Sequence, residues 1–173
     1  MKLVHSIETS RLIIREFTKE DALFAASIWN DPTMGEYLPD ESMTEIDPEY
    51  LHSLETLGED EECCYLIVTS KADHSRIGTC SFMPDETSKA HDIAYCVHKD
   101  YWRMGYGTEI AQALIDYASS LGMEKITVRV NQDNPGSNGI MKKLGFEIVD
   151  TISYLKRGTT ITFTDYLYEK KLK

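Results

Sequence analysis

Two closely spaced glycines, Gly105 and Gly107, are the residues of this chain whose spacing most directly suggests chemistry. They follow an apolar run over 90–98 that predicts a strand, and they precede an apolar periodicity over 108–121 that predicts a helix. Glycine lets the backbone approach a ligand closely, and the N–H groups of a first helical turn are free to bind an anion. The helix dipole favours negative charge at the same place. We therefore expect this turn to hold a phosphate group.

The turn differs from the two commonest phosphate-binding motifs. A P-loop requires Gly-Lys-Ser or Gly-Lys-Thr, and the chain contains neither. A dinucleotide fingerprint requires a third glycine where Ile110 stands. These differences argue against a nucleotide-dependent phosphotransferase. A G-x-G turn alone is also compatible with a simple tight connection.

Length and charge narrow the class of protein. A chain of 173 residues, 42% of them hydrophobic, suits one domain with a sizeable core. A net charge of −11 argues against nucleic acid or an anionic membrane as the main partner. It would favour a cationic acceptor such as an amine, although an acidic surface also simply keeps a protein in solution. No apolar run reaches a membrane span and the N-terminus lacks a signal-peptide core, so we expect a cytoplasmic protein.

The four cysteines, Cys63, Cys64, Cys80 and Cys96, show no metal-ligand spacing. They are also too few and too irregular for a secreted disulfide framework. We expect all four to be reduced and mostly buried, and we expect no metal site.

The remaining pattern predicts alternating strands and helices, without an internal repeat or a linker. Expected strands cover 9–15, 63–70, 76–83, 90–98, 125–131, 146–156 and 159–169, and expected helices cover about 18–30, 48–57, 108–121 and 138–143. The expected core includes Tyr65, Ile67, Ile77, Ile93 and Val97. The acidic segment 34–62 could be a rim that attracts a cation or an ordinary solvated face.

Three passages resemble the GNAT N-acetyltransferase superfamily. YWRMGYGTEI (101–110) resembles its acetyl-CoA pyrophosphate loop, and Trp102 indicates the branch that acetylates ribosomal proteins. ETSRLIIR (8–15), followed by Asn-Asp-Pro at 30–32, resembles the opening of the same branch, and NPGSNGIMKKLGF (134–146) resembles the second cofactor motif. The likeness extends over 9–172, except for 34–62.

The resemblance implies an α/β (α+β) GNAT fold. Its central sheet would be mixed, mostly antiparallel, of about seven strands, flanked by helices, with a splayed pair of parallel strands at the cofactor site. It also implies a single acetyltransferase domain over 1–173.

The same resemblance implies a binding site for acetyl-CoA. Backbone groups of Tyr95, Cys96 and Val97 would pair with the pantetheine arm, and Asn134 and Ser137 would flank it. The pyrophosphate would bind the backbone amides of Arg103, Met104, Gly105, Tyr106, Gly107 and Thr108. Arg103 and Met104 replace the usual Gly-Lys of the branch, which changes the side chains and keeps the amides.

The mechanism implied is direct attack of an amine on the thioester in a ternary complex. Many members carry a tyrosine seven residues after the motif Asn134, but this chain has Met141 there. Ser137 occupies the place of the serine that the ribosomal-protein branch uses as thiolate acid. Serine at a helix start is also a common N-cap, so the two roles compete.

The general base is less well defined by the residues. Family members often carry a glutamate near the start of the cofactor strand, where Asp92 stands, and a shorter carboxylate would act through a water. His91 and Glu62 are alternatives. Tyr95 and Tyr106 could line the acyl site or belong to the core.

The expected acceptor is a primary amine, either a protein or peptide N-terminus or a small amine. The expected assembly is a monomer or a homodimer. The competing function is that of a non-catalytic acyl-CoA-binding sensor or interaction module, which would bind the cofactor without turning it over.

Overall fold

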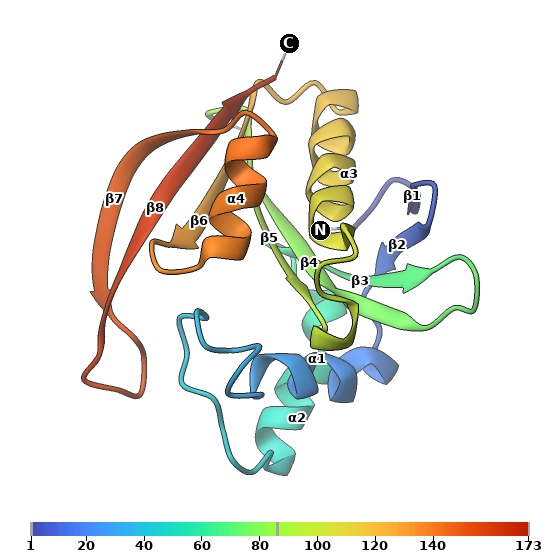
Figure 1. The fold of residues 1–173 in the computed structure, drawn as a ribbon. Coiled ribbons are helices and arrows are strands. Elements are labelled where there is room, and N and C mark those ends of the chain that lie inside the picture. Colours follow the sequence, from blue (N-terminus) through green and yellow to red (C-terminus); the bar gives the residue numbers. More distant parts are fainter. Residues whose placement is uncertain (1, 86, 173) are drawn as a thin grey trace.

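The computed structural model describes residues 2–85 and 87–172. Its described strands form one eight-stranded sheet in the order β1-β2-β3-β4-β5-β6-β8-β7 (Figure 1). The strands are β1 (Ile7–Glu8), β2 (Leu12–Glu16), β3 (Cys64–Ser70), β4 (Arg76–Asp85), β5 (Ala90–Val97), β6 (Lys125–Asn131), β7 (Glu147–Leu155) and β8 (Thr162–Lys171). The helices are α1 (Ala22–Trp29), α2 (Pro48–Glu55), α3 (Tyr106–Ser120) and α4 (Pro135–Lys143). None of the described helices has the length and apolarity needed to cross a membrane.

The predicted fold class is confirmed. Every neighbouring pair of strands is antiparallel except β5 and β6, which are parallel. Seven strands lie within a few residues of their predicted positions. The eighth, β1, has two residues, too few to show the alternation from which strands are predicted.

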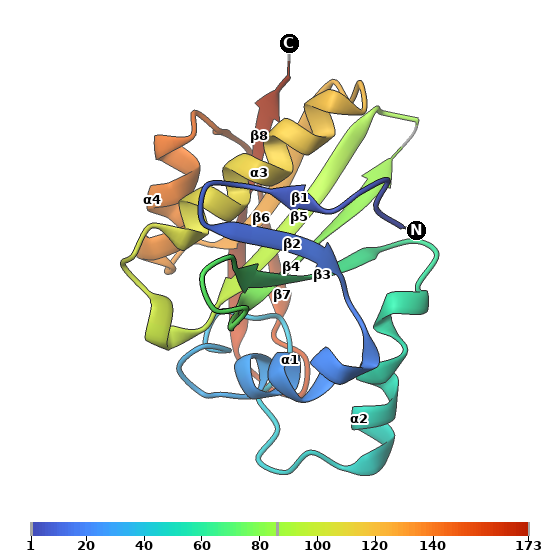
Figure 2. The same cartoon turned by 90° about the vertical axis from the view of Figure 1, so that its right-hand side faces the viewer.

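The sheet separates two layers of helices, and alternation along β3 shows how. Cys64, Leu66 and Val68 point into the larger core cluster, to which α3 contributes seven buried residues. Tyr65 packs on the opposite face against the smaller cluster of α1 and α2. Figure 2 shows α3 lying across the strands, with α1 and α2 apart from it. Hydrophobic burial on both faces therefore fixes the orientation of each strand.

The expected core is largely confirmed, and the two exceptions lie near the ends of the inner strands β3 and β5. Ile67, Ile77 and Ile93 are buried, whereas Tyr65 and Val97 are half-buried. All four cysteines are free thiols, of which Cys64 and Cys80 are buried and Cys63 and Cys96 are half-buried.

Buried ion pairs join β2 and β4 to the 3-10 turn that precedes α1. Asp21 is fully buried and accepts hydrogen bonds from Arg15 of β2 and Arg76 of β4, both at 2.7 Å. Thr18 and Asp21 form a capping box around a 3-10 turn (Lys19–Asp21), so α1 begins only at Ala22. Burial by itself raises the pKa of Asp21, but the hydrogen bonds from both arginines lower it to about 2.

Strands β5 and β6 separate after three paired positions. Their pairing stops at Asp92 and Thr127, while β5 stays bonded to β4 as far as Val97 and β6 stays bonded to β8 throughout. The two strands diverge visibly in Figure 1. The predicted splay is therefore present, and the inner backbone edge of β5 from Ile93 onward is not paired with β6.

Candidate active site

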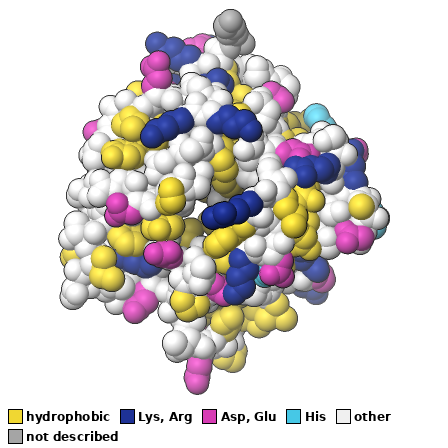
Figure 3. Space-filling model, in the orientation of Figure 1, with side chains coloured by type: hydrophobic (Ala, Val, Ile, Leu, Met, Phe, Trp, Pro, Cys, Tyr) yellow, Lys and Arg dark blue, Asp and Glu magenta, His cyan; other side chains and the backbone are white. Residues whose placement is uncertain are grey.

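A cleft of about 1170 Å³ opens where β5 and β6 separate. Its walls are the two strands, the glycine turn, the start of α4, the segment 33–39 and the end of the β7–β8 hairpin. Figure 3 shows this face hollowed near its centre, with hydrophobic and basic side chains beside the hollow. The cleft is lined by eleven of the residues predicted to form the site: Asp92, Tyr95, Cys96, Val97, Arg103, Gly105, Tyr106, Gly107, Thr108, Asn134 and Ser137. Met104 is exposed on the outside of the turn and does not line the cleft.

The backbone of the glycine turn is left-handed at two positions just before α3. Gly105 caps α3 with a φ of 82°, and Arg103 also lies in the left-handed region with a φ of 62°. The helix begins at Tyr106, two residues before its predicted start, and its first residues, Tyr106, Gly107 and Thr108, line the cleft. Trp102 Nε1 donates to the Val97 carbonyl at 2.7 Å and fastens the turn to that strand.

Gly107 has a packing role in addition to the phosphate-binding role that the sequence predicts for its amide. A Cβ at this position would lie 2.9 Å from Ile140 Cδ1 and 3.5 Å from Tyr95 Cε2. Gly107 thus allows α3, α4 and β5 to pack closely behind the turn, whereas Gly105 provides the positive φ.

Arg11 holds the turn from outside, a role that the sequence analysis did not assign. Its Nη1 donates to the Met104 carbonyl at 2.9 Å, and its Nη2 lies 2.6 Å from Glu109 Oε2. Its guanidinium also stacks over the Tyr106 ring at 4.2 Å. Arg11 and Glu109 lie in two of the passages that carry the family resemblance, but their contact leaves no pattern in the sequence.

The start of α4 corrects one prediction. The helix begins at Pro135, because Asn134 is its N-cap and accepts from the Ser137 N–H at 3.1 Å. The N-cap alternative for Ser137 is therefore wrong, and its hydroxyl is not used for capping. Asn134 Nδ2 lies 3.4 Å from Ser137 Oγ. Met141 is fully buried in the core, away from any chemistry.

Tyr95 faces α3 and α4 from the splayed part of β5. Its ring is half-buried, and burial raises the pKa of its hydroxyl to about 12, while the nearby Ser137 side chain opposes this shift. Tyr106 instead lies between Arg11 and Tyr101 at the turn.

Asp92 is the one base candidate that lines the cleft. It points to the opposite face from Tyr95, is half-buried, and accepts from Thr127 Oγ1 at 2.7 Å. Burial raises the pKa of Asp92, against the effects of the Thr127 hydrogen bond and of Arg129. His91 is buried on the other face, stacked on Phe82 at 4.8 Å, and Glu62 is exposed before β3.

The face of the sheet that carries Asp92 also bears polar residues that the sequence analysis missed. Strand register places Arg129, Asn131 and Asp165 on this face, since paired residues point the same way. Tyr154 donates to Asp165 Oδ2 at 2.9 Å, and Tyr154, Arg129 and Asp165 all line the cleft. Only the register of strands distant in sequence brings these residues together.

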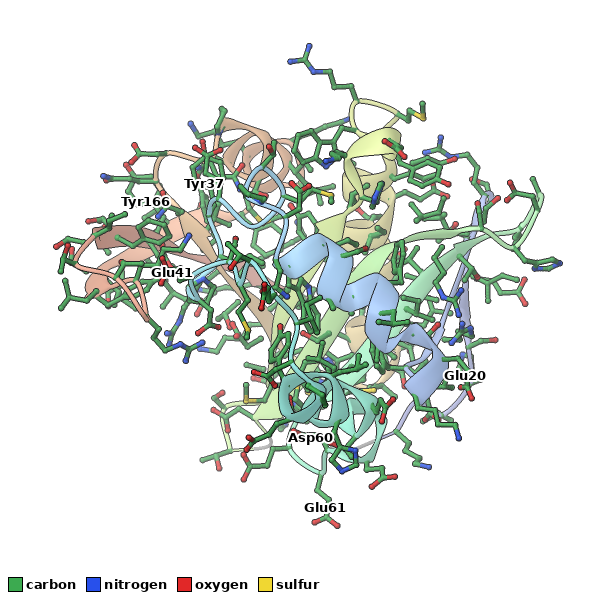
Figure 4. The ribbon with its side chains drawn as sticks, turned by 90° about the horizontal axis from the view of Figure 1, so that it is seen from below. Glu20, Tyr37, Glu41, Asp60, Glu61 and Tyr166 are labelled. Carbon is green, nitrogen blue, oxygen red and sulfur yellow. The ribbon has the colours of Figure 1, made fainter. Side chains whose placement is uncertain are left out.

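The segment 33–41 closes this side of the cleft and is fastened to the β7–β8 turn. Lys156 is buried and donates to the Glu36 carbonyl at 2.9 Å. Arg157 forms two hydrogen bonds with the Asp40 carboxylate, and its own N–H donates to the Pro39 carbonyl at 2.8 Å. Figure 4 shows the segment that carries Tyr37 and Glu41 running beside this hairpin.

Fold and cleft together define an acyltransferase of the GNAT class, and comparison with known proteins agrees. The family model described as Acetyltransferase (GNAT) domain matches residues 11–147, and the chain belongs to this family of N-acetyltransferases. It is 26% identical over 148 residues, 83% of each chain, to p20, an uncharacterized N-acetyltransferase of Bacillus licheniformis.

Solved structures share the fold at low sequence identity. Spermidine N-acetyltransferase from Vibrio cholerae, in complex with CoA and spermine, superposes with a TM-score of 0.81 at 15% identity, covering 94% of this chain and 96% of its own. Ribosomal-protein-S5-alanine acetyltransferase from Vibrio fischeri superposes with a TM-score of 0.74 at 21% identity, covering 96% of each chain. The predicted resemblance to the GNAT superfamily is confirmed by the family model.

The cleft fits acetyl-CoA, the acyl donor that membership of this family supports. The open backbone edge of β5 offers peptide groups to an extended amide chain, as an edge strand does. The glycine-capped start of α3, which suits a pyrophosphate, lies at the end of that edge.

Proposed function

We propose that this enzyme transfers the acetyl group of acetyl-CoA to a primary amine by direct attack in a ternary complex. The observation that carries the proposal is the splay of β5 and β6, which opens onto the glycine-capped start of α3 and has Asp92 and Ser137 on its two sides. Backbone groups of Tyr95, Cys96 and Val97 would hold the pantetheine arm, with Asn134 beside it. Amides from Arg103 to Thr108 would hold the pyrophosphate.

Asp92 would receive the amine proton, directly or through a water. A cationic acceptor first releases one proton to solvent and becomes a neutral amine. As the N–C bond then forms and the C–S bond breaks, a second proton leaves the nitrogen for Asp92 and the sulfur leaves as a thiolate. A raised pKa makes Asp92 a stronger base than an exposed carboxylate, and the Thr127 hydrogen bond keeps it oriented. Ser137, whose hydroxyl is free of a capping role, would donate a hydrogen bond to the thiolate, which solvent then protonates.

The acceptor would enter over the face that bears Asp92, Arg129 and Asp165. Two carboxylates on this face and the net charge of −11 favour a cationic acceptor, such as a peptide N-terminus or a small amine. The related structures described above carry both kinds of acceptor in their names.

Mass spectrometry with acetyl-CoA and a mixed amine panel tests the proposal. The panel holds peptides with Ser, Ala or Met at the N-terminus, polyamines and aminoglycosides. Detection by mass avoids the four protein thiols, which would react in a coenzyme A thiol assay. We expect acetylation of one class. Tight acetyl-CoA binding without any product would instead favour a sensor.

A further inference from the structure

The hydroxyl of Tyr95 is a buried polar group whose bonding is incomplete. Within residues 2–85 and 87–172, it and one carboxylate oxygen of Asp165 are the buried side-chain polar atoms that make no hydrogen bond. A buried hydroxyl is normally bonded, so an exception beside a reaction site calls for an explanation. Tyr95 stands on the splayed part of β5, and its side chain lines the cleft.

The ring of Tyr95 packs beside α4. The ring edge lies close behind Gly107, where a Cβ would be 3.5 Å from Tyr95 Cε2 and 2.9 Å from Ile140 Cδ1. Ile140 stands one helical turn after Ser137 on α4, so the ring of Tyr95 lies beside the helix face that carries this serine. Ser137 is also the neighbouring side chain that lowers the pKa of Tyr95 against the effect of burial.

The hydrogen bonds that Ser137 already makes determine which bond the hydroxyl of Tyr95 can add to it. A serine hydroxyl donates one hydrogen bond and accepts two. Asn134 Nδ2 approaches Ser137 Oγ at 3.4 Å, and Asn134 Oδ1 is occupied by the Ser137 N–H. If the Tyr95 hydroxyl also donates to Ser137 Oγ, both acceptor positions of the serine are filled. The hydroxyl proton of Ser137 is then left to point into the cleft, and the chain of bonds strengthens it as a donor.

We propose that Tyr95 is a positioning residue that orients the Ser137 hydroxyl as hydrogen-bond donor to the departing thiolate. This inference rests on the proposed function, because it acts through the role given there to Ser137. Tyr95 transfers no proton in this arrangement. It fixes the direction in which Ser137 donates.

The test compares Tyr95→Phe, Ser137→Ala and the double variant in steady-state kinetics, with acetyl-CoA affinity measured separately by calorimetry. We expect Tyr95→Phe to lower kcat about tenfold, as loss of one hydrogen bond in the transition state would. The Kd for acetyl-CoA should stay within about twofold, since the ring remains in place. The double variant should be no slower than Ser137→Ala, because the two residues act as one unit.

Tyr168→Phe is the matched control. Tyr168 is also a buried tyrosine near α4, but its hydroxyl already donates to Asn138 Oδ1 at 2.7 Å, away from the cleft. Its loss should lower the melting temperature and leave kcat within about twofold of wild type.

The possible outcomes separate the proposed function from the role of Tyr95. A wild-type enzyme without transfer would remove the proposed function and the inference with it. Unchanged turnover in Ser137→Ala would overturn the role of the serine and therefore that of Tyr95. A slow Ser137→Ala variant beside a fully active Tyr95→Phe variant would overturn the inference alone. So would additive losses in the double variant, or a Tyr95→Phe defect explained by weaker acetyl-CoA binding.

Discussion

At the scale of single residues, two carboxylates show how environment separates structural from chemical roles. Asp21 is fully buried, and two arginines lower its pKa to about 2, so it remains charged at any working pH. Asp92 is half-buried beside the open cleft, where burial raises its pKa. A carboxylate with a lowered pKa is a poor base, whereas a raised pKa favours proton uptake.

Removing the charge of Asp92 should slow turnover. We expect Asp92→Asn to lower kcat by about a hundredfold, the usual contribution of a general base, with little change in acetyl-CoA affinity. Thr127→Ala should move the acidic limb of the kcat profile to higher pH, because the lost hydrogen bond stabilises the charged form. Thr127→Ser keeps the hydroxyl and serves as the control. An unshifted limb in Thr127→Ala would argue against Asp92 as the titrating base.

Asp21 should instead make the free energy of unfolding depend on pH in the acidic range. Its pKa is lowered in the folded state, so its contribution is complete above its ordinary value of 3.8 and is lost as the pH falls toward 2. A lowering from 3.8 to about 2 corresponds to roughly 2 kcal/mol of unfolding free energy. Urea denaturation of wild type and Asp21→Asn between pH 2 and 7 measures it, and we expect the two stabilities to converge in acid. A constant difference across that range would contradict this assignment.

At the scale of elements, Arg11 connects the β1–β2 turn to the start of α3. The guanidinium donates to the Met104 carbonyl, pairs with Glu109 and stacks on Tyr106, so one side chain contacts both the turn and the first helical turn of α3. The turn that would bind the pyrophosphate is thus held by one residue that lies 93 positions earlier in the chain.

Replacing Arg11 by lysine should therefore weaken cofactor binding. Lysine keeps the charge but can neither form the paired hydrogen bonds nor stack on the ring, and we expect the Kd for coenzyme A to rise about fivefold. Calorimetry measures this directly. Lys71→Met, which removes a partly exposed ion pair with Glu8 near the same strands, is the control and should change the Kd by less than twofold. Equal affinities for wild type and Arg11→Lys would show that the turn holds its shape unaided.

Elements with strong local patterns were predictable, and those set by distant contacts were not. The apolar face of α3 and the apolar residues of β3 to β6 appear in the sequence itself. The start of α4 was misplaced because Asn134 and Pro135 form the cap three residues before the predicted helix. The role of Arg11 was missed because an ion pair between distant residues leaves no periodic trace.

At the scale of the whole molecule, the half of the cleft proposed to hold the cofactor was predictable, and the half proposed to hold the acceptor was not. Residues of the cofactor half lie in two continuous passages, 92–108 and 134–137. The half proposed to hold the acceptor is built from four segments that are separate in sequence: β6, β7, β8 and 33–39. The last of these has no strong periodicity. Only the paired register of β6, β8 and β7 assembles Arg129, Asp165 and Tyr154.

Lys156 should keep the segment 33–41, which we call the acceptor wall together with the β7–β8 turn, well ordered. It should not affect the half of the cleft proposed to hold the cofactor. Lys156→Met removes the buried ammonium that donates to the Glu36 carbonyl, and we expect faster amide exchange over 35–41 and a KM for the amine raised severalfold. Affinity for acetyl-CoA should not change. Hydrogen exchange followed by mass spectrometry, together with kinetics, measures both. Protection over 35–41 equal to wild type would mean that the Asp40–Arg157 pair is sufficient.

The fastening of segment 33–41 to the β7–β8 turn has a consequence for how substrate range can change. The two pieces of the acceptor wall are separated by more than a hundred residues of sequence, yet they meet through Lys156 and Arg157. Transplanting either piece alone from a relative would leave a buried ammonium or a carboxylate without its counterpart. Only a joint exchange preserves the contacts, so the two segments should be inherited, and engineered, as one unit of specificity.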